Sequence, residues 1–144
     1  MILAHHVIFS AYGFWLPNDP RGSWSKFVGS WELVRFGRAT LANTAKSVAN
    51  VRHDTQVRLA AKLQLKYPAI QFTGIQAVSI AKGFAAAAQD AHYVIHACCI
   101  LPEHVHLVVQ EHARPIRHIV GHLKAESTRS LRADGLYSFA APSP

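Results

Sequence analysis

The chain has 144 residues, half of them apolar and 16% charged, which is typical of one folded domain and excludes an intrinsically disordered segment. Lys and Arg outnumber Asp and Glu by 15 to 8, so the net charge is +7 and a polyanion such as nucleic acid is the expected partner. The apolar runs are too short for a membrane span, and the N-terminus lacks an export signal. We therefore expect a cytoplasmic protein without a membrane partner.

An alternating pattern predicts a first strand over residues 5–12, with Val7 and Phe9 on one side and His6 on the other. Residues 13–72 are then expected to form a long insertion, mostly loop, because Pro, Asn, Asp and Gly recur there at turn-forming positions. The insertion separates the first strand from the rest of the fold.

Two helices are expected next. A short one is predicted from an Asp54 cap to Lys66, and its basic residues recur every four positions on one face: Arg58, Lys62 and Lys66. A longer one is predicted from a Thr73 cap to about Asp90. Its expected apolar stripe consists mostly of small residues: Ile75, Val78, Ala81, Ala85 and Ala88.

The second half of the chain predicts a hairpin and a third helix. Strands over residues 92–100 and 104–110 are joined by the short connection 101–103, and Pro115 opens a helix that Gly135 ends. This order of elements predicts an α+β, ferredoxin-like βαββα(β) fold, with an antiparallel sheet and both helices on one face. The tail after the last helix is too short to supply a sixth strand with certainty.

The most specific local feature is the pair His104 and His106. Because residues two apart in a strand share a face, both imidazoles are expected to project together from the face that the helices leave free. They form a workable pair of metal ligands, to which His6, His96 or Glu103 can add a third. The simpler interpretation of an isolated His-x-His is two polar surface residues.

Hairpin register decides which cysteine faces this pair. If Ile100 pairs with His104, Cys98 lies opposite His106 and His96 shares that face, whereas a slip of one residue reverses the assignment. A structural zinc site that uses the histidines and Cys98 is an alternative, although the chain lacks the paired Cys/His spacing of such sites. The adjacency of the two cysteines excludes a disulfide framework.

Three segments carry a family resemblance. Ile-Leu-Pro-Glu-His-Val-His-Leu-Val-Val (100–109) resembles the His-hydrophobic-His signature of the HUH single-tyrosine transposases, which include insertion-sequence and REP-associated families. Ala-Tyr-Gly-Phe-Trp-Leu-Pro-Asn-Asp-Pro-Arg-Gly-Ser-Trp-Ser (11–25) and Leu-Lys-Ala-Glu-Ser-Thr-Arg (123–129) look like other segments of REP-associated members. Together the resemblance extends from about His5 to Leu131.

The resemblance implies a divalent metal, Mg²⁺ or Mn²⁺, held by His104 and His106, and cleavage and rejoining of single-stranded or hairpin DNA. In that mechanism a tyrosine hydroxyl attacks the scissile phosphate and leaves a 5′-phosphotyrosyl enzyme and a free 3′-hydroxyl. Imidazole ligands by themselves favour manganese or zinc over magnesium. Nucleoid association and homodimers are also implied.

The resemblance further implies a nucleophilic tyrosine on a helix that follows another strand. Neither element is expected before Pro144, so residues 1–144 are expected to be a single HUH domain, C-terminally truncated and impaired in strand transfer. Tyr137 follows the HUH strand and is the candidate nucleophile; the alternative is a tail residue that packs on the last helix. Tyr12 is expected to orient substrate or to pack.

Candidate DNA contacts are basic, hydroxyl and aromatic side chains of the third helix and the first loop: Lys124, Arg129, Arg117, Thr128, Arg21, Trp15 and Tyr12. A solvated helix face and loop anchoring are the alternative interpretations. The second functional hypothesis is a non-catalytic module that binds single-stranded DNA or RNA on the same sheet. The remaining histidines are expected to be surface or capping residues: His53, His112, His118 and His122.

Overall fold

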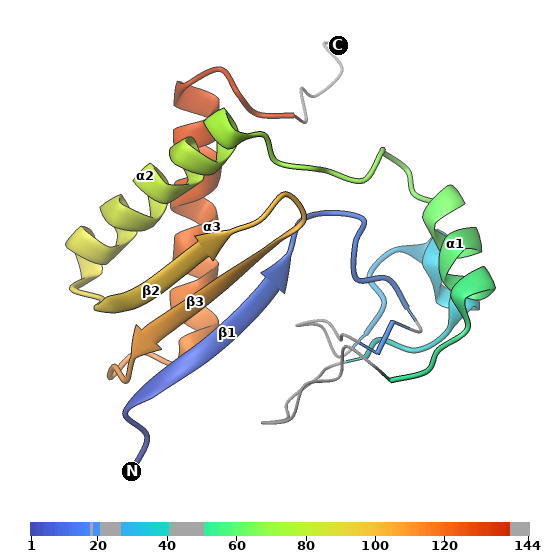
Figure 1. The fold of residues 1–144 in the computed structure, drawn as a ribbon, viewed down its shortest axis with the longest axis horizontal. Coiled ribbons are helices and arrows are strands. Elements are labelled where there is room, and N and C mark those ends of the chain that lie inside the picture. Colours follow the sequence, from blue (N-terminus) through green and yellow to red (C-terminus); the bar gives the residue numbers. More distant parts are fainter. Residues whose placement is uncertain (18, 21–26, 41–50, 139–144) are drawn as a thin grey trace. The chain divides into compact units, whose positions relative to one another are not determined.

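The computed structural model describes residues 1–17, 19–20, 27–40 and 51–138. The chain divides into two compact units, Met1–Ile8 with Gln71–Pro144 and Phe9–Ile70. The first unit contains the hairpin and two long helices, and the second contains two short helices (Figure 1). No helix in the described part of the chain is both long and apolar enough to cross a membrane.

Three strands form the sheet, which confirms the predicted α+β class. They are β1 (Ala4–Ser10), β2 (Ile95–Ile100) and β3 (His104–Gln110), arranged antiparallel in the order β1-β3-β2 (Figure 1). Alternate residues of the central strand are buried, namely Val105, Leu107 and Val109. The sheet therefore has one buried face and one face on which the intervening β3 side chains remain partly accessible.

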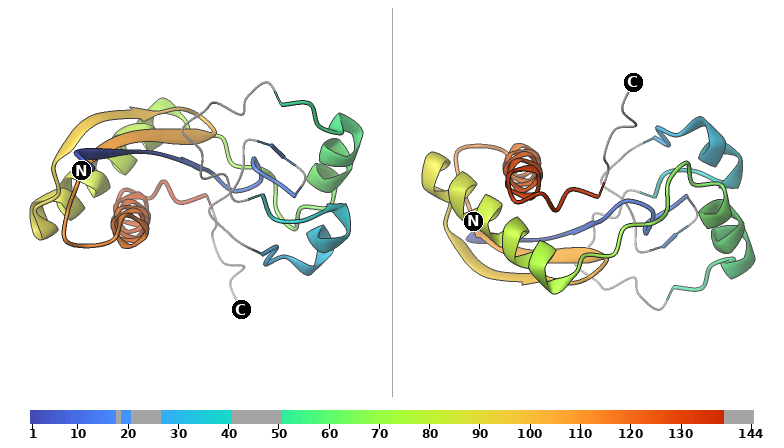
Figure 2. Two further views of the ribbon diagram at one scale, coloured as in Figure 1. Left: turned by 90° about the horizontal axis from the view of Figure 1, so that it is seen from below. Right: turned by 90° about the horizontal axis from the view of Figure 1, so that it is seen from above.

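Helices α2 (Gly74–Ala91) and α3 (Ile116–Ala133) both cover the buried face (Figure 2). Thr73 caps α2 as predicted. Its hydroxyl accepts from the Gln76 backbone N–H at 3.3 Å, and the Gln76 side chain accepts from the Thr73 N–H at 2.9 Å. This reciprocal capping box satisfies two backbone donors at the start of the helix and explains why α2 begins at this point.

The predicted apolar stripe of α2 was wrong. Ile75 and Val78 are exposed, and the buried residues are instead Ser79, Ile80, Gly83, Phe84 and Ala87. The alanine-rich sequence is apolar on several sides, so spacing alone could not select the buried face. Close packing against α3 selects the face that carries Gly83, and this face also buries the larger Ile80 and Phe84.

Gly83 marks the closest approach of α2 to α3. A Cβ atom at this position would lie 2.5 Å from the Ser127 Cα and 2.6 Å from the Ser127 backbone nitrogen. The Ser127 hydroxyl donates within its own helix to the Leu123 carbonyl oxygen at 2.8 Å, so its burial costs little. A Lys82–Asp134 ion pair at 3.5 Å also links the two helices.

The third helix ends as predicted at Gly135, whose φ of +69° is the left-handed conformation that glycine adopts readily. The Gly135 N–H donates to the Arg132 carbonyl oxygen, and the Leu136 N–H donates to the Leu131 carbonyl oxygen. This is the Schellman arrangement of a helix C-terminus. By contrast, the predicted start of β2 was wrong, because His92 adopts φ 56° and caps α2, and the strand begins three residues later.

The hairpin has the alternative register. Cys99 pairs with His106 and Ile100 with Val105, and the Leu101 N–H donates to the His104 carbonyl oxygen at 2.9 Å. The expectation that Cys98 lies opposite His106 was therefore wrong by one residue. The tight turn at residues 102–103 sets this register at the hairpin end, and a shift between Ile95 and Ala97 absorbs the difference further along β2.

The second unit contains the 3₁₀ helix η1 (Trp31–Phe36) and the helix α1 (Thr55–Leu63). Its small core is formed by Leu16, Leu33 and Ala61, with Val28, Phe36 and Leu65 packed around them. The Asp54 side chain caps α1 as predicted, by accepting from the Val57 N–H at 3.0 Å. The helix ends earlier than expected, so Lys66 lies beyond it and the predicted basic stripe keeps Arg58 and Lys62 on α1.

Candidate functional site

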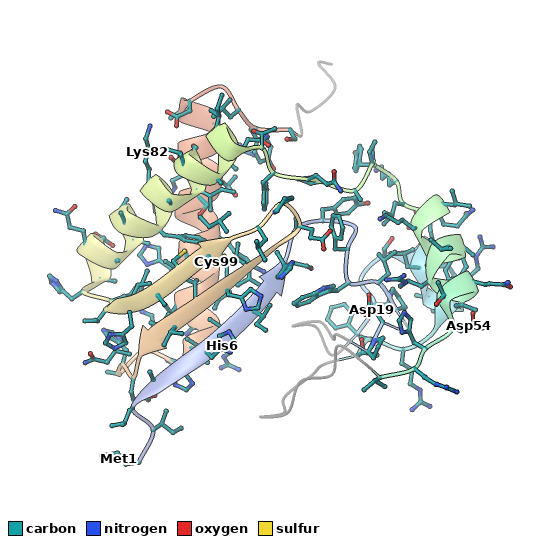
Figure 3. The ribbon with its side chains drawn as sticks, in the orientation of Figure 1. Met1, His6, Asp19, Asp54, Lys82 and Cys99 are labelled. Atoms are coloured by element: carbon teal, nitrogen blue, oxygen red, sulfur yellow. The ribbon has the colours of Figure 1, made fainter. Side chains whose placement is uncertain are left out.

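The accessible face of the sheet gathers three histidines. His104 and His106 project from alternate positions of β3 and their ring centroids are 4.9 Å apart, as two ligands on one strand face require. His6 on β1 joins them, since its Nε2 lies 3.2 Å from the His106 Nδ1. His6 and Cys99 are labelled in Figure 3, which views the sheet from the face opposite α3. We call His6, His104 and His106 the histidine cluster.

The two rings of the His6–His106 contact lie end to end. Their planes differ by only 19°, and their centroids are 5.4 Å apart although the facing nitrogens are 3.2 Å apart. The centroid distance exceeds the nitrogen distance by about twice the distance from an imidazole centroid to its own nitrogen. The two nitrogens therefore point toward each other, nearly in the planes of their rings. This is hydrogen-bond geometry, in which one nitrogen carries the proton and the other accepts it.

The surroundings of His106 disfavour its protonated form. Burial lowers the pKa of its imidazole below the ordinary value of 6.5, and the neighbouring His104 and His6 lower it further. A metal-binding imidazole must offer an unprotonated nitrogen, so the lowered pKa favours ligation near neutral pH. The same physical cause makes a doubly charged cluster unfavourable.

Of the three expected third ligands, two have described contacts with the pair. His96 is exposed and lies at the register shift of β2, between the pairs Ile95–Val109 and Ala97–Val108. Glu103 Oε1 is 4.0 Å from the His104 Nδ1, and His6 contacts His106. Cys99 pairs with His106 across the hairpin. Residue spacing alone left this register open. Burial raises the pKa of Cys98, which pairs with the buried-side residue Leu107.

The fit of this site to a metal ion is partial. Among the residues that the structure describes, no group of three His, Cys, Asp or Glu side chains converges on one point as a complete ligand set. Two neighbouring imidazoles can still supply two ligands, leaving the other positions to water or phosphate oxygens, as an open catalytic site requires. The donor set therefore offers two ligands of such an open site, His104 and His106.

Tyr137 lies beyond the end of α3, near the start of α2. The Arg132 guanidinium stacks over its ring at 4.7 Å. The flanking residues are held by the Gln76 amide, which donates to the Leu136 carbonyl oxygen at 3.0 Å and to the Ser138 hydroxyl at 2.9 Å. These contacts place Tyr137 with the ends of the two helices rather than with the histidine cluster.

The candidate DNA contacts of α3 lie on two sides of the helix. Arg117, Lys124 and Thr128 follow one another at intervals of seven and four residues and therefore share a side. Burial lowers the pKa of Lys124, although part of its side chain is accessible. The Thr128 hydroxyl donates to the Lys124 carbonyl oxygen at 3.0 Å, and Arg129 pairs with Glu126. Because α3 covers the buried face, these residues and the histidine cluster lie across the sheet from each other.

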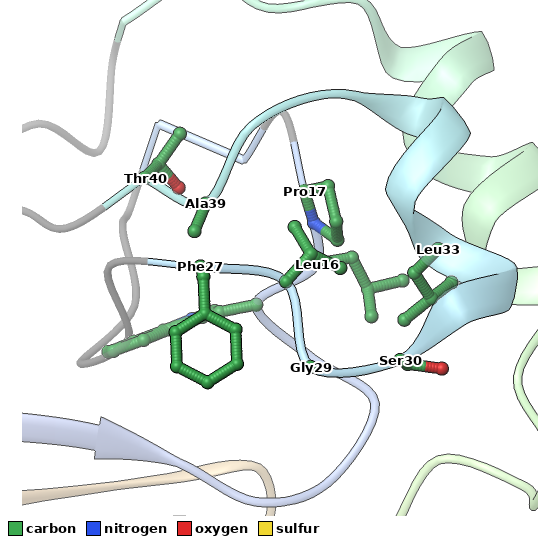
Figure 4. Close-up of a pocket in the computed structure, with 10 residues that line it drawn as sticks. Leu16, Pro17, Phe27, Gly29, Ser30, Leu33, Ala39 and Thr40 are labelled. Atoms are coloured by element: carbon green, nitrogen blue, oxygen red, sulfur yellow. The ribbon is translucent and has the colours of Figure 1, made fainter.

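The other candidate contacts belong to the second unit. Arg21 lies outside the described residues. Tyr12 follows the end of β1 rather than lying in the strand; it is exposed, and it meets the Tyr67 ring edge at 6.4 Å. Trp15 is half-buried and, with Phe27, lines a mainly apolar pocket that also includes Leu16 and Leu33 (Figure 4).

A second polar network was not predicted from the sequence. The Tyr93 hydroxyl accepts from the Arg114 guanidinium at 2.6 Å and lies 3.1 Å from the His122 Nδ1. The other nitrogen of His122 is 3.8 Å from carboxylate oxygens of both Asp90 and Glu126. His122 is thus part of a part-buried network rather than the expected surface or capping residue. The sequence signal that could have indicated this network is the i, i+4 spacing of His122 and Glu126, which places the two side chains together on a helix.

One family comparison bears on the chain. The family model described as "Transposase IS200 like" matches residues 56–137, which is more than half of the chain and includes both histidines of β3. No curated protein matches the chain.

Proposed function

Because the chain belongs to the IS200-like transposase family, we propose that it cleaves and rejoins single-stranded DNA with a divalent metal ion held by His104 and His106. The observation that carries this proposal is the adjacent pair of imidazoles on the accessible sheet face, with ring centroids 4.9 Å apart. DNA binding follows from the family. The proposal adds three points to DNA binding: a single-stranded substrate, metal dependence and the strand-transfer chemistry.

In this proposal the imidazoles of His104 and His106 would hold the ion. The lowered pKa of His106 favours its unprotonated ring near pH 7, so His106 can offer a nitrogen ligand beside His104. When bound there, a divalent ion supplies charge that polarises a phosphoryl oxygen and orients the scissile phosphate. Mn²⁺ suits the imidazole ligands better than Mg²⁺, although either ion is compatible with the proposed chemistry.

Tyr137 is the proposed nucleophile of this reaction. Its hydroxyl oxygen would form a bond to the scissile phosphorus and lose its proton, while the bond from phosphorus to the 3′ oxygen breaks and that oxygen leaves as a 3′-hydroxyl. The reverse attack by a 3′-hydroxyl would release the tyrosine and rejoin the strand. Since the described contacts of Tyr137 lie at the end of α3, attack at the histidine cluster requires a rearranged tail or a tyrosine from a second chain.

DNA contacts are proposed for two places. Arg117, Lys124, Thr128 and Arg129 on α3 offer donors to phosphate oxygens on the helical side of the sheet. In the second unit, aromatic residues including Trp15 and Tyr12, together with Arg21, offer stacking and charge to unpaired bases. Substitution of Lys124 should weaken binding similarly for all sequences, because a phosphate contact carries no base information.

The deciding experiment incubates the chain with an end-labelled single-stranded hairpin DNA and Mn²⁺ and scores a protein–DNA adduct that survives denaturation. Wild type should form the adduct, and His106→Ala should not. His96→Ala provides a matched control, since it removes another accessible histidine of the same sheet. Tyr137→Phe tests the nucleophile, because it removes only the hydroxyl.

Each result has a definite meaning. Adduct that is lost in His106→Ala and Tyr137→Phe but retained in His96→Ala supports the complete proposal. Adduct that persists in Tyr137→Phe assigns the nucleophile elsewhere. Metal-dependent DNA binding without any adduct contradicts cleavage and leaves a non-catalytic module that binds single-stranded nucleic acid.

A further inference from the structure

We propose that His6 is a positioning residue that fixes the ring tautomer of His106, so that His106 binds the metal through Nε2. The inference rests on the proposed function, because it concerns how one of the proposed ligands is held. It starts from the short contact between the His6 Nε2 and the His106 Nδ1, at 3.2 Å. Both residues lie in the first unit, on neighbouring strands of one sheet.

The contact admits two arrangements of one proton. Either the His106 Nδ1–H donates to the His6 Nε2, or the His6 Nε2–H donates to the His106 Nδ1. In the second arrangement the His106 Nδ1 is the acceptor, so a neutral His106 carries its proton on Nε2. That nitrogen then cannot bind an ion. The first arrangement leaves the His106 Nε2 unprotonated, so metal binding selects His6 as the acceptor.

Direct ligation by both facing nitrogens would require the rings to turn from their observed orientation. Their lone pairs point along the line that joins them, and two metal–nitrogen bonds of about 2.0–2.1 Å in a line need about 4 Å. The observed separation is 3.2 Å and the rings are within 19° of one plane. The contact thus suits a hydrogen bond behind a ligand, the usual means by which a ligating histidine is oriented.

His104 has a similar arrangement on the same nitrogen. Its Nδ1 faces the Glu103 carboxylate at 4.0 Å, within ion-pair range but longer than a hydrogen bond. Both histidines of β3 therefore direct Nδ1 toward a protein partner, which leaves Nε2 as the ligating nitrogen of each. Glu103→Gln should have a smaller effect than loss of His6, because its contact is the longer one.

The test measures Zn²⁺ binding and ring tautomers, with Zn²⁺ as a diamagnetic probe. Zinc affinity should fall about 10- to 100-fold in His6→Ala, the usual effect of losing an outer partner of a ligand. His6→Gln should restore much of the loss, since its amide oxygen can accept from the His106 Nδ1–H. In zinc-loaded wild type, imidazole ¹⁵N spectra should show His106 protonated at Nδ1 and coordinated through Nε2. His96→Ala serves as the control and should bind like wild type.

The outcomes distinguish this inference from the proposed function. Unchanged affinity in His6→Ala, together with lost binding in His106→Ala, overturns the role of His6 and leaves the metal site intact. Coordination of His106 through Nδ1, or failure of His6→Gln to restore binding, also overturns it. If His104→Ala and His106→Ala both bind zinc as wild type does, the proposed metal site itself is wrong.

Discussion

Substitution of Gly83 by alanine should destabilise the first unit, although alanine is the better helix former. In a helix with free space, the change from glycine to alanine stabilises by about 1 kcal/mol. At Gly83 the new Cβ would lie 2.5–2.7 Å from backbone atoms of Glu126 and Ser127, which cannot move aside as a side chain can. Overpacking of this kind typically costs about 1–3 kcal/mol, so we expect a net loss of that order.

Gly121 on α3 provides a matched control. Apart from the adjacent residues and the backbone of α3 itself, no described atom lies within 4 Å of a Cβ built there, so Gly121→Ala should stabilise by up to about 1 kcal/mol. Thermal and urea unfolding followed by far-UV circular dichroism reports the two long helices. Tryptophan fluorescence reports the second unit, because all three tryptophans lie between residues 9 and 70. For a chain of this length, 1 kcal/mol changes Tm by about 2–4 °C. Equal stabilisation by both substitutions would refute the inferred close approach of α2 and α3.

Three further predictions concern the cap, the histidine cluster and the cysteines. Thr73→Ala should cost about 0.5–2 kcal/mol in urea unfolding, because the Gln76 N–H loses its acceptor; no change would contradict the capping box. Since the pKa of His106 is lowered in the folded state, the free energy of unfolding should fall as pH decreases below 6.5, and His106→Gln should reduce that slope in urea titrations above and below this pH. Burial raises the pKa of Cys98, so iodoacetamide should alkylate Cys99→Ser more slowly when folded than when unfolded in urea, and equal rates would refute this.

Local signals predicted the parts of the fold that local chemistry controls. Thr73 and Gln76 form the expected cap, Gly135 ends α3, and β3 spans the predicted residues. The alternation of His104 and His106 with buried valine and leucine placed both imidazoles correctly on the accessible face. Each of these features depends on residues that are neighbours in the sequence.

Features that depend on contacts between distant segments were not predictable in the same way. The buried face of α2 is decided by the approach of Ser127 from α3, and the alanine-rich sequence offered no contrast between its sides. The hairpin register was open by one residue, so Cys98 was expected where Cys99 lies. His6 was one of three equally suited candidates near the metal ligands until the pairing of β1 beside β3 brought it to His106.

The register shift in β2 also divides the hairpin into two stretches with different tolerance to change in chain length. Between Ala97 and the turn, pairing is continuous and places Cys99 beside His106. On the other side of the shift, the strand leads back to α2, and an extra residue is already accommodated at His96. We therefore expect that a residue inserted or deleted between α2 and Ala97 leaves the histidines of β3 in place. A single-residue insertion between Cys99 and the turn would instead exchange the sides of the sheet on which the two thiols lie.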